Sequence, residues 1–114
     1  MLEDNEKKVG IHFIININNV DDKIIYSENT LFEIFEELIK ICNVTVLNKT
    51  YHKFKPYGLT GLYLLSESHL SFHTWPEYNK ICLDIFTCGK NKEQEIKNFL
   101  NKLFTNYTFK IIER

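Results

Sequence analysis

The chain has 114 residues, the length of one domain, and its 44% of hydrophobic residues is enough to form a core. Its formal net charge of −1 excludes the strongly positive surface on which nucleic-acid binding depends. No apolar run is long enough to span a membrane. We therefore expect a single domain over residues 1–114 with neither nucleic-acid nor membrane partners.

The start of the chain and its cysteines indicate a location. The first ten residues, MLEDNEKKVG, lack the apolar stretch of a signal peptide, so we expect none. The three cysteines, Cys42, Cys82 and Cys88, are odd in number and lack the paired spacing of a metal site. These features predict reduced thiols, no metal centre and a cytoplasmic protein.

The first third of the chain predicts a strand and then a helix. Residues 9–17 (VGIHFIINI) are rich in β-branched side chains, which favours a buried strand. The polar residues 18–28 are expected to form a loop. Thr30 and Glu33 have the spacing of a capping box, so a helix should begin at Thr30 and run to about Cys42. One stripe of this helix is apolar and should pack on a sheet.

The middle of the chain predicts four consecutive strands. Residues 44–54 and 60–66 favour strands, and the Pro and Gly at 55–58 favour a turn between them. Residues 68–74 alternate between apolar and polar side chains, which is typical of a half-buried strand. Residues 80–87 alternate in the same way.

The last third predicts a second helix and a closing strand. Asn91 is expected to cap the helix, whose apolar residues recur at helical spacing, and residues 107–112 form the strand. The order is therefore β-α-β-β-β-β-α-β. Short connections favour antiparallel pairing with both helices on one face, which is an α+β two-layer sandwich. The other sheet face needs a cover, and a second copy of the chain is the simplest one.

The chemically reactive residue types gather between Ser68 and Cys88. Ser, His and Cys side chains serve nucleophilic attack and proton transfer. Taken singly, each has an ordinary interpretation. Ser68 is typical of a turn, His73 of a hydrogen-bonded structural histidine, and Cys88 of a small buried side chain. Trp75 is typical of a core residue and Glu77 of a solvated one.

Taken together, these motifs resemble the bacterial and archaeal S-adenosylmethionine decarboxylase family, whose members are pyruvoyl enzymes. The resemblance covers about residues 51–89. It rests on HKF at 52–54, ESH at 67–69, HTWPE at 73–77 and DIFTCG at 84–89, with Pro56, Gly58 and Thr60 at the family's positions. Several near-identical motifs at matching spacings are far more specific than one short motif.

The resemblance implies that the chain cuts itself between Glu67 and Ser68. The Ser68 hydroxyl would attack the preceding carbonyl to give an ester, and elimination and hydrolysis would leave a pyruvoyl group and ammonia. Residues 1–67 would become the beta chain and residues 68–114 the alpha chain. A ketone next to an amide can condense with a substrate amine and accept the electrons left when CO2 departs.

The resemblance also implies a role for each site residue. His73 acts as base in the elimination, Thr60 assists processing, and Cys88 returns a proton to the substrate carbon. Glu77 binds the ribose hydroxyls, while Phe54 and Trp75 stack on the adenine or on the sulfonium. The family builds its active site from both protomers of a dimer, so we expect a homodimer. The implied product, decarboxylated S-adenosylmethionine, feeds spermidine biosynthesis.

Two stretches depart from the family pattern. Asn16 stands where a Glu is expected to contact the charged parts of the substrate, and residues 78–81 replace a Gly-Tyr pair. The change at Asn16 leaves open a pyruvoyl-dependent decarboxylase of another amino acid, such as ornithine or arginine. A third hypothesis is a non-catalytic partner subunit, which the presence of Ser68, His73 and Cys88 disfavours.

Overall fold

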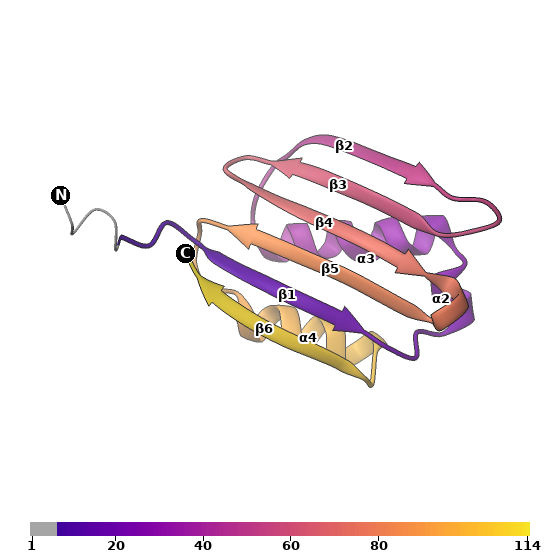
Figure 1. Ribbon diagram of the computed structural model, residues 1–114. Helices are drawn as coiled ribbons and strands as arrows, with labels where there is room; N and C mark the ends of the chain where they lie inside the picture. Colours follow the sequence, from indigo (N-terminus) through magenta and orange to yellow (C-terminus); the bar gives the residue numbers. More distant parts are fainter. Residues whose placement is uncertain (1–6) are drawn as a thin grey trace.

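A computed structural model describes residues 7–114, and the first six residues of the polar start lie outside this range. The molecule has two layers, a six-stranded sheet and helices that pack on one of its faces (Figure 1). The strands are β1 (Ile11–Ile17), β2 (Val46–Lys53), β3 (Leu59–Leu65), β4 (Ser68–Trp75), β5 (Lys80–Thr87) and β6 (Tyr107–Glu113). The prediction of an α+β two-layer sandwich is confirmed.

The sheet has the order β2-β3-β4-β5-β1-β6, and each neighbouring pair is antiparallel. The first strand therefore lies inside the sheet, between β5 and the last strand. Its alternate residues Phe13, Ile15 and Ile17 are fully buried. Their β-branched or aromatic side chains suit a pleated surface that is covered on that face.

Helices α3 (Glu28–Ile41) and α4 (Glu93–Leu103) cover this face of the sheet (Figure 1). Their apolar stripes supply much of the core, including Phe35 and Leu38 from α3 and Ile96 and Leu100 from α4. No helix among the described residues is long and apolar enough to cross a membrane.

The structure corrects the predicted start of the first long helix. Ser27 rather than Thr30 is its N-cap, because the Ser27 side chain accepts a hydrogen bond from the Thr30 backbone N–H at 3.2 Å. The expected loop at 18–28 also contains a short helix, α2 (Asp22–Ile25), capped by Asp21. Ile25 is buried there, and this tertiary contact outweighs the polar composition on which the loop prediction rested.

The second long helix begins close to its predicted position. The Asn91 side chain accepts a hydrogen bond of 2.8 Å from the backbone N–H of Glu93, the first helical residue. A short 3₁₀ turn, η1 (Pro76–Tyr78), separates β4 from β5. Pro76 occupies the first turn, where its missing N–H costs no hydrogen bond.

No described helix lies over the other face of the sheet (Figure 1). Leu62, Leu64, Trp75 and Ile112 alternate with core residues on their strands and are exposed on this helix-free face. An exposed apolar face of this kind marks an interaction surface. The helix-free face also carries Thr60, His73 and Trp75.

Candidate active site

The turn between β3 and β4 contains the peptide bond at which cleavage is expected. Leu65 pairs with Ser68, so Ser66 and Glu67 form a two-residue hairpin turn. Glu67 has a φ of 61°, in the left-handed region that non-glycine residues seldom adopt. Holding a residue there costs on the order of 1–3 kcal/mol. The Glu67–Ser68 bond is therefore at a strained position.

Cys88 lies beside this turn because β5 ends at Thr87, next to the start of β4. The Cys88 thiol donates a hydrogen bond of 3.0 Å to the backbone carbonyl oxygen of Glu67. The Ser68 hydroxyl donates to the carbonyl oxygen of Ser66 at 3.3 Å. Glu67 and Cys88 line a pocket of about 440 Å³, together with Lys90 and Lys92. A thiol, a hydroxyl and a strained carbonyl thus meet at one end of the sheet.

His73 lies towards the opposite end of β4, on the helix-free face. Its Nδ1 is 2.9 Å from the hydroxyl of Thr60, its cross-strand partner on β3. The indole of Trp75 stacks on the His73 ring, with a centroid distance of 5.6 Å and an angle of 30°. These two contacts fix the orientation of the His73 ring. Neither contact is a hydrogen bond to its Nε2.

The side chains expected to bind substrate gather in one pocket of about 440 Å³. Phe54, Trp75 and Glu77 all line it, and so does Thr60, which is expected to assist processing. The turn between β2 and β3 forms one wall, where Gly58 has a φ of 113° that suits glycine. Phe54 and Trp75 are both exposed, so their rings are available to stack on a flat group.

The structure does not bring all the predicted catalytic residues together within one chain. Ser68 and Cys88 lie at one end of β4, and Thr60, His73 and the pocket lined by Phe54 and Glu77 lie at the other. His73 follows Ser68 by five residues of extended strand, which is roughly 16 Å. We call these groups the cysteine half-site and the histidine half-site.

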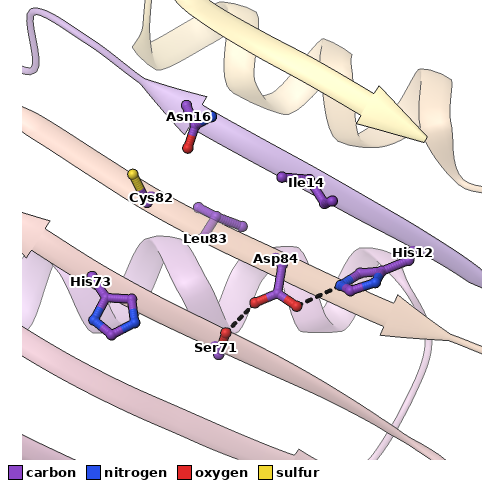
Figure 2. A pocket seen from close by; sticks show the side chains of 8 residues that line it. All are labelled: His12, Ile14, Asn16, Ser71, His73, Cys82, Leu83 and Asp84. Carbon is purple, nitrogen blue, oxygen red and sulfur yellow. Dashed lines mark hydrogen bonds and ion pairs between the residues drawn. The ribbon is translucent and has the colours of Figure 1, made fainter. Parts of the chain in front are cut away.

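Sequence reasoning missed a hydrogen-bonded network between the half-sites. The Asp84 carboxylate accepts hydrogen bonds from Ser71, from His12 at 2.5 Å and from His69 at 3.2 Å. Figure 2 shows Asp84 between Ser71 and His12 in a pocket of about 310 Å³. Three adjacent strands supply these residues. Asp84 carried a weak signal, since it is a charged residue inside a strand of alternating Ile and Leu.

The network keeps Asp84 ionised. Partial burial alone raises the pKa of this carboxyl, but hydrogen bonds from Ser71, His12 and His69 outweigh burial and hold the pKa below its ordinary value of 3.8. His12 Nδ1 is 3.5 Å from the Arg114 guanidinium, which can only donate. His12 therefore accepts at Nδ1 and carries its proton on Nε2, which donates to Asp84.

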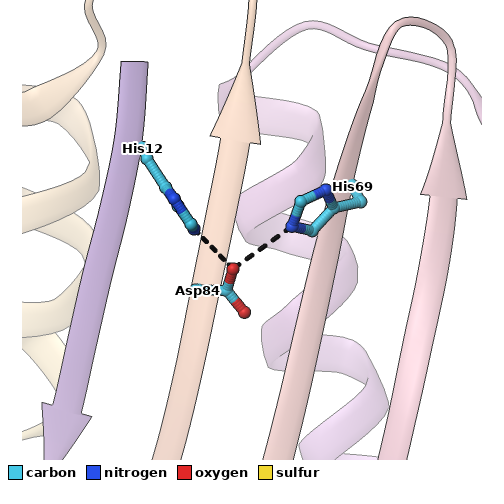
Figure 3. A group of neighbouring side chains, drawn as sticks. All are labelled: His12, His69 and Asp84. Atoms are coloured by element: carbon cyan, nitrogen blue, oxygen red, sulfur yellow. Dashed lines mark hydrogen bonds and ion pairs between the residues drawn. The ribbon is translucent and has the colours of Figure 1, made fainter. Parts of the chain in front are cut away.

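Three side chains of this network, those of His12, His69 and Asp84, form the one group in residues 7–114 that could hold a metal ion. The ligand atoms of His12, His69 and Asp84 lie within 4.8 Å of one another (Figure 3). A metal ion would need the Nε2 lone pair of His12, and the contact with Arg114 leaves a proton there. We therefore assign this group as a hydrogen-bonded network.

Asn16, the departure from the family pattern, lies near His73. Asn16 pairs with Cys82 across β1 and β5, and Cys82 pairs with His73 across β5 and β4. Asn16 and His73 also line the same pocket (Figure 2). A neutral amide therefore occupies a position within reach of the histidine half-site.

The fold is that of a known class of enzyme. The chain is similar to the crystal structure of the adenosylmethionine decarboxylase from Aquifex aeolicus, with a TM-score of 0.81 and 31% identity. The match covers 95% of this chain and 92% of that one. A sequence model of the S-adenosylmethionine decarboxylase family matches residues 11–114. The chain belongs to this family, as its motifs indicated.

Relatives from archaea are named S-adenosylmethionine decarboxylase proenzyme. The chain is 46% identical to the one from Thermoplasma volcanium over 84 residues, which is 74% of this chain and 65% of the relative. It is 42% identical to the one from Archaeoglobus fulgidus over 96 residues, 82% of this chain and 86% of that protein. The chain thus spans just under two thirds of the length of the Thermoplasma relatives.

Proposed function

We propose that this protein is a pyruvoyl-dependent S-adenosylmethionine decarboxylase that makes decarboxylated S-adenosylmethionine for spermidine biosynthesis. It forms its prosthetic group by cutting itself between Glu67 and Ser68, into fragments 1–67 and 68–114. The observation that carries the proposal is the hydrogen bond of 3.0 Å from the Cys88 thiol to the Glu67 carbonyl, at a turn where Glu67 is left-handed. Family membership supports the same activity.

The residues at the turn suit self-cleavage. As the Ser68 hydroxyl attacks the Glu67 carbonyl carbon, a C–O bond forms, the C–N bond breaks, and the nitrogen takes a proton. Negative charge develops on the carbonyl oxygen, to which the Cys88 thiol already donates. Leaving the left-handed conformation releases strain and favours the cut. His73 then removes the α-proton in the elimination that follows.

The chain's residues also fit a pyruvoyl group derived from Ser68. Ser68 borders the pocket-lining residue Glu67, and the Cys88 thiol is close by. When formed, the group supplies the electron sink that decarboxylation needs. Cys88 holds the proton that returns to the substrate carbon. Glu77 accepts hydrogen bonds from the ribose, and Phe54 and Trp75 stack on the adenine or the sulfonium.

The separation of the half-sites supports a homodimer. Within one chain, His73 cannot reach Ser68, about 16 Å away along the strand. Suppose that a two-fold axis runs parallel to the sheet and perpendicular to its strands, at the level of Ser71 and Asp84. The helix-free face of one protomer then packs against the helix-free face of the other. This arrangement brings the histidine half-site of each protomer to the end of the partner's sheet at which the cysteine half-site lies. It also buries the exposed side chains of Leu62 and Leu64.

Cleavage is tested by intact mass spectrometry of the denatured protein. Wild type should give two fragments, residues 1–67 and residues 68–114. The second fragment should begin with a keto group that reacts with hydroxylamine. Ser68→Ala should give one full-length chain, because no hydroxyl is present to attack. Two fragments from Ser68→Ala would rule out this mechanism. An uncut, inactive wild type would instead favour a non-catalytic partner subunit.

The substrate is tested by CO2 release. Asn16 lines a pocket with His73 and is neutral, which keeps ornithine and arginine as alternative substrates. We expect release from S-adenosylmethionine, and release from ornithine or arginine alone would overturn the proposal. Cys88→Ala should still cut at least in part but turn over about 10²-fold more slowly. Unchanged turnover would remove Cys88 from the reaction.

A further inference from the structure

The network around Asp84 is not used by any step described above. Asp84 lies in the middle of β5, opposite Ser71 of β4 and Ile14 of β1. Figure 3 shows its carboxylate between the rings of His12 and His69, which approach from the two neighbouring strands. Both rings direct Nε2 at the same oxygen, Oδ2. Because an ionised carboxylate can only accept, each histidine donates a proton to it.

The carboxylate is itself held in place. Ser71 donates to its other oxygen, Oδ1. The His12 ring is fixed by the contact of its Nδ1 with Arg114, and it packs edge-on against Phe86 at a centroid distance of 6.0 Å. Asp84 is therefore an anchored acceptor, and the His69 ring is joined to that anchor.

His69 is the second residue after the proposed cleavage point, directly following Ser68. While the chain is intact, the turn at Ser66 and Glu67 holds Ser68 in place. After cleavage Ser68 is a chain end, and chain ends fray unless they are tied down. Ser68 pairs with Leu65 of β3, but the register with β5 begins only at His69. On the β5 side, the His69–Asp84 bond is thus the side-chain hydrogen bond nearest the new end.

We propose that Asp84 is a positioning residue that holds the new amino end of fragment 68–114 beside Cys88, acting through His69. The inference rests on the proposed self-cleavage. A proton reaches the correct atom only while donor and acceptor stay within hydrogen-bond distance. The covalent link that fixed residue 68 is lost on cleavage, and the bond between His69 and Asp84 remains.

The test compares hydrogen exchange in cut and uncut protein. Asp84→Asn preserves the shape of the side chain but removes its charge and one acceptor oxygen. In the cleaved protein, we expect backbone amide exchange over residues 69–71 to rise several-fold in this variant. In a Ser68→Ala background, which stays uncut, the same substitution should raise the exchange of residues 69–71 much less.

A matched control removes a hydrogen bond elsewhere. Tyr107→Phe, on strand β6, which β5 and β1 separate from β4, deletes the bond of 2.6 Å from the Tyr107 hydroxyl to Asn101. Exchange over residues 69–71 should be the same in this control as in wild type. If Asp84→Asn does not fold, His69→Gln allows the same comparison, because it leaves His12 and Asp84 paired.

Two results would overturn the role of Asp84. The first is unchanged exchange over residues 69–71 in the cut protein. The second is an equal rise in the cut and uncut proteins, which would mean that Asp84 only stabilises the sheet. Failure of the proposed function is detected by a different measurement. In that case the wild-type chain remains a single band on a denaturing gel, before any exchange experiment is made.

Discussion

At the scale of single residues, the environment separates the three cysteines. Cys42 is buried at the C-cap of α3, Cys82 is half-buried, and Cys88 is exposed beside the Glu67 carbonyl. Burial raises the pKa of the Cys42 thiol to about 11, although Lys92 opposes this rise. The three cysteines are alike in the sequence, but the fold gives their thiols different exposures and different environments.

Alkylation should distinguish these thiols. At pH 8 the Cys42 thiol is only about one part in a thousand thiolate, so iodoacetamide should leave it unmodified. Cys88 should be the first cysteine modified, because it is exposed. Peptide mass spectrometry after a short reaction measures both. Modification of Cys42 as fast as Cys88 in the folded protein would contradict this assignment.

The lowered pKa of Asp84 predicts a loss of stability in acid. Its carboxyl has a lower pKa in the folded state than in the unfolded chain, so the network stabilises the fold above about pH 4. That stabilisation is lost as the pH falls further, through the pKa of the folded state. Asp84→Asn should be less stable than wild type at neutral pH but lose less stability between pH 5 and pH 2. Urea titrations at several pH values measure the difference, and parallel curves would contradict the prediction.

At the scale of elements, strand β4 serves both the core and the site. Leu70, Phe72 and Thr74 point towards the helices and are buried, while His69, Ser71 and His73 lie on the helix-free face. This division follows from the two-residue period of a strand. The core residues set the register that determines where each site residue lies.

Thr74→Val should destabilise the pairing of β3 with β4 near the histidine half-site. Thr74 is buried, and its hydroxyl accepts a hydrogen bond of 2.9 Å from the Leu59 backbone N–H. Valine has a similar shape but leaves that N–H without its partner, so we expect a loss of about 1–3 kcal/mol of unfolding free energy. Urea denaturation measures this loss. Thr50→Val, on the exposed edge strand β2, is the control and should change stability by less than about 0.5 kcal/mol.

At the scale of the whole molecule, the central question is how two distant half-sites act together. The half-sites lie at opposite ends of a sheet whose helix-free face is open and partly apolar. A closed two-fold dimer is the simplest assembly that covers such a face. Under the proposed function, such a dimer would complete two active sites at once, each with residues from both protomers.

Complementation tests this assembly. Ser68→Ala retains His73, and His73→Ala retains Ser68 and Cys88, so each variant should be inactive alone. When the two are co-expressed, random pairing makes half the dimers mixed, each with one complete site, and activity should reach about a quarter of wild type. A co-expressed mixture that remains inactive and uncut would contradict the shared site.

Much of the fold followed from local patterns. The strand at 80–87 was predicted to its exact ends, and the helices and the antiparallel two-layer architecture followed from periodicity and short connections. The start of α3 was missed because two possible caps, Ser27 and Thr30, lie three residues apart, and only the local backbone chose between them. The motifs were also sufficient to identify the family.

The sequence by itself determined the periodicity, the motifs and the family, because these depend on residue types at short spacings. Only the tertiary structure decided that Asp84 joins His12 and His69, since those residues are brought together by strand order. It also decided that Ser68 and His73 lie in different half-sites. Ser68 and His73 are close in the sequence, but the extended strand between them holds them far apart in space. His12 and Asp84 are far apart in the sequence, but the order of strands in the sheet brings them into contact.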